Sequence, residues 1–149
     1  GASPDDEVIV LAEPLAATIV ESLALIHGLP IVLLLFIVAL GVSLATEVSS
    51  NTAMAAVLMP IMAVTAVSIG LNPIILMTTA AICSSMAFML PVATPPNAVA
   101  YGSGYVSAGD LLRSGWALTL IGVTLWTIFL FTLVLWALGI TFALPAWAI

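Results

Sequence analysis

Long apolar runs separated by short polar islands make up most of this chain. Apolar runs extend over residues 30–46, 53–69, 73–90 and 111–139. An α-helix rises about 1.5 Å per residue and needs about 20 apolar residues to cross a bilayer, so each run is long enough to cross much or all of one. The last run exceeds that length, which predicts a tilted or partly interfacial helix. The pattern predicts an all-α integral membrane protein.

Composition supports the same class. Of the 149 residues, 64% are hydrophobic and 5% are charged, whereas about a quarter of the residues in a soluble domain are charged. The net charge of −6 comes from seven acids against one base, Arg113. Because basic residues are so few, nucleic-acid binding is excluded. Arg113 is interpreted as a topology anchor that places the loop at 102–113 in the cytoplasm. The protein is expected in the plasma (inner) membrane.

Two polar islands interrupt the apolar runs: Ser49-Ser50-Asn51-Thr52 and Thr94-Pro95-Pro96-Asn97. Each contains residues that stop a helix and leave main-chain groups unpaired. Inside a membrane, unwound main chain is tolerated only where it is buried in protein or lines a cavity, because lipid offers no hydrogen bonds. Two such breaks in one chain indicate a site for a polar solute, as in a transporter.

The first island allows two interpretations. Ser, Asn and Thr are favoured N-caps, so the island could simply begin the helix that follows. Alternatively, residues 30–47 and 52–69 form the two arms of a re-entrant hairpin with the island at its tip. The start of the second arm would then offer free N–H groups to an anion. Carbonyl groups near residues 46–49 would suit a hard cation, as at the ends of discontinuous helices in transporters.

The second island predicts a broken helix, with the break over residues 91–97. Two consecutive prolines remove two N–H donors and free the carbonyl groups around residues 90–93. Asn97 is expected to cap the short helix that follows. A proline kink that only bends a helix is the alternative interpretation of this element.

The charges near the islands restrict the ligands. No Lys or Arg lies near either island, so co-bound cations would have to balance the charge of a bound anion. A helix dipole contributes only about 0.3–2 kcal/mol, less than the cost of desolvating a carboxylate. Sodium is favoured, because the ligands on offer are neutral oxygens. Glu47 is the one candidate for proton coupling, although it could equally pair with a donor from elsewhere or cap locally.

An enzyme is the least expected class. The lone His27 and Cys83 are far apart in the sequence, and no nucleophile–base spacing or metal-ligand cluster is visible. No organic cofactor is expected.

Two stretches carry a family resemblance: Thr46-Glu47-Val48-Ser49-Ser50-Asn51-Thr52-Ala53 and Ala87-Phe88-Met89-Leu90-Pro91-Val92-Ala93-Thr94-Pro95-Pro96-Asn97-Ala98. The first is similar to the Ser-Asn-Thr signature at the tip of the second re-entrant hairpin of the divalent anion/sodium symporter family. The second is similar to the Thr-Pro-Pro-Asn break in the helix paired with that hairpin. The chain therefore resembles the sodium-coupled dicarboxylate, citrate and sulfate transporters.

The resemblance implies roles for individual residues. Ser50, Asn51 and Thr52 would contact a carboxylate or sulfate oxygen of the substrate, with Thr94 and Pro95 approaching from the other side. A second set, implied to hold one co-transported Na⁺ ion largely through main-chain carbonyls, consists of Thr46, Ser49, Asn51 and Ala93. Members of the family are built from two inverted repeats, form homodimers and work by an elevator-type motion.

Only one Ser-Asn-Thr and one Thr-Pro-Pro occur here, so the chain resembles the C-terminal repeat, and the N-terminal repeat is missing. The expected division is a polar leader and interfacial helix at 1–28, the re-entrant hairpin at 29–70, the broken transmembrane helix at 71–104, and a C-terminal transmembrane helix and tail at 105–149. The expected function is one half of a sodium-coupled importer of a small divalent anion, with a dicarboxylate favoured over sulfate. The alternatives are a proton-coupled or other ion transporter of the same superfamily, or a non-transporting truncated membrane subunit.

Overall fold

The structure is a computed structural model that describes residues 30–146, so the leader and interfacial helix expected at 1–28 lie outside the described residues. The elements in chain order are α2 (Ile31–Thr46), α3 (Asn51–Ser68), α4 (Pro73–Cys83), α5 (Pro95–Gly102), α6 (Ala108–Phe129), the π-helical turn η1 (Leu130–Val134) and α7 (Leu135–Leu138). Within residues 30–146, β pairing is limited to an isolated bridge between Leu71 and Ala143. The all-α prediction is confirmed for this part of the chain.

The turn from α3 to α4 is encoded locally. Gly70 has a φ of +72°, a conformation that glycine adopts without a steric penalty. The Leu71 N–H donates to the Ala66 carbonyl at 2.8 Å, the long hydrogen bond of a Schellman motif. Asn72 then caps α4, because its Oδ1 accepts a hydrogen bond from the Ile74 N–H at 3.1 Å. Gly70, Leu71 and Asn72 therefore end α3 and begin α4 within one short turn.

The predicted run at 111–139 forms one long element. Ser107 and Asp110 make a capping box at the start of α6, which satisfies two of the free N–H groups there. The helix continues through η1 into α7, giving a 30-residue apolar element at Ala108–Ala137. That element and the 18-residue α3 are the two helices in the described part of the chain that are long and apolar enough to cross a membrane.

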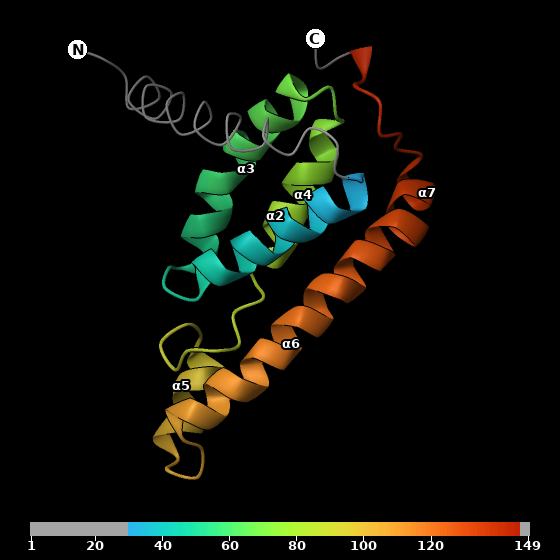
Figure 1. The fold of residues 1–149 in the computed structure, drawn as a ribbon. Coiled ribbons are helices and arrows are strands. Elements are labelled where there is room, and N and C mark those ends of the chain that lie inside the picture. Colours follow the sequence, from blue (N-terminus) through green and yellow to red (C-terminus); the bar gives the residue numbers. More distant parts are fainter. Residues whose placement is uncertain (1–29, 147–149) are drawn as a thin grey trace, which may run out of the picture.

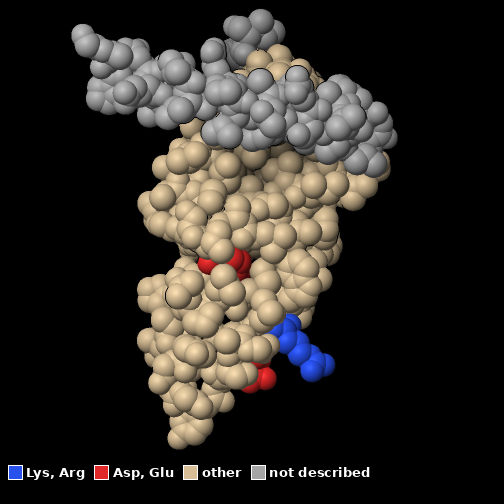
Figure 2. Space-filling view, turned by 60° about the vertical axis from the view of Figure 1, so that its left-hand side comes forward, with Lys and Arg blue, Asp and Glu red and all other residues tan. Residues whose placement is uncertain are grey.

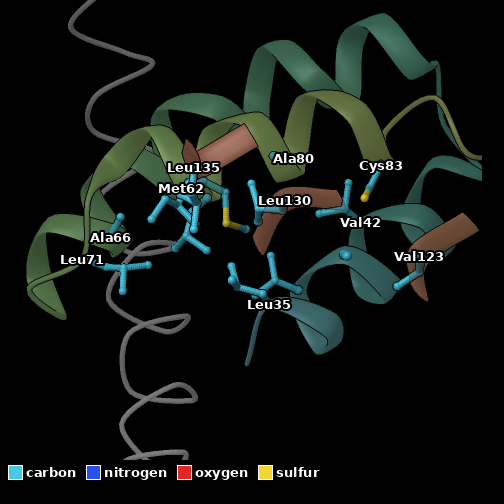
Figure 3. Packing of buried hydrophobic residues seen from close by; sticks show 14 residues of the cluster. Leu35, Val42, Met62, Ala66, Leu71, Ala80, Cys83, Val123, Leu130 and Leu135 are labelled. Atoms are coloured by element: carbon cyan, nitrogen blue, oxygen red, sulfur yellow. The ribbon is translucent and has the colours of Figure 1, made fainter. Parts of the chain in front are cut away.

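The helices pack around a shared apolar core. α2 and α3 diverge from the turn at residues 47–50, and α4 packs against both of them, while α6 runs diagonally past α2 (Figure 1). The core takes residues from each of these helices and from η1, for example Leu35, Met62, Ala80, Val123 and Leu130 (Figure 3). Much of the remaining surface is apolar and nearly uncharged (Figure 2).

The helix break begins earlier than the prolines. α4 ends at Cys83 and α5 begins at Pro95, so residues 84–94, which we call the break segment, are unwound. The predicted break at residues 91–97 overlaps the observed one at residues 91–94, and its bounds are wrong. The fixed φ of proline suits the first turn of a helix, where its missing N–H costs nothing. Pro95 and Pro96 consequently begin α5, and the unwinding has another cause, described below.

Gly115 allows the break segment to lie directly on α6. A Cβ placed on Gly115 would overlap the Phe88 carbonyl oxygen and lie 2.7 Å from the Met89 Cα. Gly115 is buried in α6, and the atoms it faces are main chain, which cannot rotate away as a side chain can. The close approach of two backbones at this point requires glycine.

Replacing Gly115 tests this contact. We expect Gly115→Ala to destabilise the protein by about 1–3 kcal/mol through overpacking, although Ala normally stabilises a helix interior by about 0.5–1 kcal/mol relative to Gly. The measurement is the thermal unfolding of the purified protein in detergent. Gly109→Ala in the same helix is the matched control, since its added Cβ meets only the Ser107 Oγ at 3.7 Å. Equal unfolding temperatures for the two variants would contradict the close contact.

Candidate functional site

Glu47 is the centre of the contacts that hold the break segment. Its side chain is only 4% exposed. One carboxylate oxygen, Oε1, accepts hydrogen bonds from the N–H groups of Phe88 at 2.7 Å and Met89 at 2.9 Å. The other, Oε2, accepts from the Leu90 N–H at 2.9 Å and shares the Met89 N–H at 3.1 Å. Successive N–H groups aimed at one anion form a nest that stabilises negative charge. Glu47 in turn satisfies three donors that the unwound chain has lost from helical bonding.

Two hydroxyl groups of α2 bind carbonyl groups of the same segment. The fully buried Ser43 donates to the Met86 carbonyl. The Thr46 Oγ1, also fully buried, lies 2.7 Å from the Ser84 carbonyl oxygen and 2.7 Å from the Asn51 Oδ1. A hydroxyl has one proton and donates to one of these at a time; with the Asn51 amide turned over, its NH₂ group would donate to Thr46. In the second arrangement Thr46 accepts from Asn51 and donates to the Ser84 carbonyl, and so joins the start of α3 to the end of α4.

Asn97 holds the other side of the break segment. Its Nδ2 lies 3.0 Å from the Leu90 carbonyl oxygen and 3.3 Å from that of Ala87. The N-cap residue of α5 is Thr94, so the prediction that Asn97 caps this helix is wrong. Because Pro95 begins the helix earlier than expected, Asn97 lies within α5, and its amide binds back to the break segment instead.

The start of α3 keeps free main-chain donors. Ser50 is the N-cap residue, and its side chain makes no capping hydrogen bond, so the island does not act as a simple side-chain cap. The first N–H groups of a helix, here those of residues 51–53, have no partner within it, and together with the helix dipole such groups suit an anion. α5 differs, because Pro95 and Pro96 at its first two positions have no N–H to offer.

The structure places the predicted site residues in two groups. One group lies at the end of α2, the turn and the start of α3: Thr46, Ser49, Ser50, Asn51 and Thr52. The other lies at the end of the break segment and the start of α5: Ala93, Thr94 and Pro95. Among residues 30–146 no hydrogen bond runs directly between the side chains of the two groups. The connection is made through Thr46 and Glu47 to the break segment.

Several residues at this site were not predicted from the sequence. Ser43 was not considered, and Glu47 was left with three possible roles, of which pairing with a donor from elsewhere is the one observed. The spacing of these residues along the sequence could have indicated that they act together. Residues 43, 46 and 47 are three and four positions apart, so they share one face of α2. Polar groups on one face of an otherwise apolar helix indicate a polar partner packed against that face.

Comparison with known proteins shows the family of this chain. The family description "Sodium:sulfate symporter transmembrane region" matches residues 7–140. The chain belongs to the sodium:sulfate symporter family. The resemblance drawn from the two polar islands is confirmed.

Curated relatives of this chain carry the name sodium-dependent dicarboxylate transporter SdcS. The protein from Staphylococcus saprophyticus is 34% identical over 125 residues, which cover 84% of this chain and 24% of the relative. One from Staphylococcus aureus is 35% identical over 131 residues, covering 88% of this chain and 25% of the relative. The chain thus spans about a quarter of the length of the relatives it matches.

Family membership establishes the functional class and the location of the protein. The symporter family and the named relatives are transporters, so the prediction that this chain is not an enzyme is confirmed. The matched region is a transmembrane region and contains both long apolar helices. The protein is therefore an integral membrane protein of the plasma membrane, as the apolar runs predict.

The connection made by Thr46 can be tested through stability. We expect Thr46→Val to destabilise the folded protein by about 1–3 kcal/mol, because the buried Ser84 carbonyl loses its donor. The measurement is thermal unfolding of the purified protein in detergent. Thr65→Val is the matched control: Thr65 is also fully buried, but its hydroxyl bonds only to the Ile61 carbonyl within its own helix. An equal loss for both variants would show that the connection between α3 and α4 through Thr46 adds nothing.

Proposed function

We propose that this chain is the C-terminal half of a sodium-coupled secondary transporter that imports a small divalent anion. The observation that carries the proposal is the contact between two unwound stretches. Glu47 binds three N–H groups of the break segment, and the neighbouring Thr46 contacts both Asn51 and the Ser84 carbonyl. Transporters with discontinuous helices place substrate and ions where such helix ends meet.

In this proposal residues 29–70 form a re-entrant hairpin, 71–104 a broken transmembrane helix, and 105–149 a C-terminal transmembrane helix and tail. An inverted N-terminal repeat of the complete protein supplies the other half of the pocket. The quarter of the relatives' length that the chain covers supports this view. The complete protein forms a homodimer and works by an elevator-type motion.

The cation is Na⁺, held by oxygens of Thr46, Ser49, Asn51 and Ala93. Thr46 and Asn51 already lie 2.7 Å apart at their side-chain oxygens, and the carbonyl of Ala93 takes part in no hydrogen bond among the described residues. These are neutral oxygen ligands, the kind that hard cations such as sodium prefer. The word "sodium" in the names of the family and of the relatives supports the same ion.

The anion binds at the start of α3, through the first-turn N–H groups and the side chains of Ser50, Asn51 and Thr52. Thr94 and Pro95 contact it from the start of α5. Because α5 begins with two prolines, most of the main-chain donors come from α3. None of these residues is basic, so the charge of the anion is balanced by co-bound sodium, which couples the two fluxes.

A dicarboxylate is the favoured substrate, because the curated relatives are named for dicarboxylates, whereas the family description names sulfate. We expect uptake of radiolabelled succinate by the full-length protein in liposomes to require an inward sodium gradient. Excess unlabelled dicarboxylate should compete, and excess sulfate should not. Competition by sulfate at similar concentrations would reassign the substrate.

Two alternatives give other results in the same assay. A proton-coupled carrier of the same superfamily would keep its uptake without sodium and lose it when the proton gradient is collapsed. A non-transporting membrane subunit would show no uptake under either gradient. Either outcome would reject the proposed function.

Asn51→Ala tests the shared site. We expect this variant to raise the half-saturating concentrations of both sodium and succinate, because one side chain serves both ligands. The measurement is succinate uptake titrated with each ligand in turn. Asn72→Ala is the matched control, since Asn72 caps α4 and its loss should cost about 1 kcal/mol of stability without changing either titration. A normal sodium titration in Asn51→Ala would contradict the assignment.

A further inference from the structure

Glu47 is a charged residue whose side chain is buried. The other charged residues in the described part of the chain, Asp110 and Arg113, are both exposed on α6, and no ion pair is formed among residues 30–146. Burying a carboxylate without a counter-charge is costly unless hydrogen bonds compensate it. Three N–H bonds do so here. One of the few charged residues of the chain therefore packs against the break segment.

The hydrogen bonds lead from Glu47 to a proposed sodium ligand. The Leu90 N–H donates to Glu47 Oε2 at 2.9 Å. The Leu90 carbonyl accepts from the Ala93 N–H at 3.1 Å, which closes a turn over residues 90–93. Glu47 therefore fixes the turn that carries Ala93. On its other side, Glu47 directly follows Thr46, the residue that contacts Asn51 at 2.7 Å.

We propose that Glu47 is a positioning residue for the cation site, in which its carboxylate holds the Ala93 turn against Thr46 and Asn51. The inference rests on the proposed function, and it adds a residue that does not itself contact the ion. When the bonds to Phe88, Met89 and Leu90 are intact, ligands from the hairpin tip and from the break segment keep one geometry. When they are lost, the two sets of ligands move independently, and sodium has to order them on binding.

Glu47→Gln is the direct test, because the two side chains have nearly the same shape. A glutamine oxygen can still accept two of the N–H bonds, but its NH₂ group would face a donor in place of the second oxygen. The assay is succinate uptake by the full-length transporter in liposomes, titrated with sodium. We expect the half-saturating sodium concentration to rise about tenfold, which corresponds to about 1.4 kcal/mol. The half-saturating succinate concentration at saturating sodium should stay unchanged.

Asp110→Asn is the matched control. It makes the same chemical change, carboxylate to amide, in the capping box of α6, and it should leave the sodium titration unchanged. A purely structural role for Glu47 would lower the unfolding temperature of Glu47→Gln without moving the half-saturating sodium concentration. That result would overturn the inference.

The same assay distinguishes failure of the proposed function from failure of the positioning role of Glu47. If the unmodified transporter takes up succinate without sodium, the proposed function fails. If its uptake depends on sodium and Glu47→Gln shows the same titration, only the positioning role fails. Should Glu47→Gln not fold, Ser43→Ala replaces it, because it removes a single bond to the break segment at Met86. A smaller rise in half-saturating sodium is expected there, and an unchanged titration would overturn the inference.

Discussion

The structure depends on one constraint: main chain that is unwound inside an apolar molecule must find hydrogen-bond partners, because lipid supplies none. The break segment meets this constraint through four side chains. Glu47 accepts from three of its N–H groups, Ser43 and Thr46 bind two of its carbonyl groups, and Asn97 binds two more. Each side chain comes from a helix next to the segment, so satisfying the backbone also fixes where the segment lies.

The same bonds connect structure to the proposed transport. Glu47 and Thr46 lie at the end of α2, directly before the polar turn that begins α3. A movement of that turn is therefore transmitted to the break segment, and the reverse also holds. In the proposed site, sodium and substrate each take ligands from both sides, so each would stabilise the arrangement that the other needs. This is the reciprocity that coupling between two binding sites requires.

The two helix starts at the site differ in chemistry. α3 begins with ordinary residues whose first N–H groups are free, whereas α5 begins with Pro95 and Pro96. An anion between them would find main-chain donors chiefly on one side. Gly115 contributes to the site in another way, since the absence of its side chain lets the break segment rest on α6. Small residues and prolines thus shape a site that contains no basic group.

The sequence by itself determined the membrane class, the extents of α2 and α3, the turn between α3 and α4, and the presence of two polar interruptions. These features follow from local pattern: apolar runs, a glycine with positive φ and strong capping residues. The sequence did not determine where the helix that contains the second polar island breaks, or which groups Asn97 binds. Glu47, about 40 positions earlier in the sequence, takes the N–H groups of residues 88–90 and so holds this part of the break segment out of a helix. Competition between helical and tertiary hydrogen bonds is decided only when distant segments meet, and therefore only by the tertiary structure.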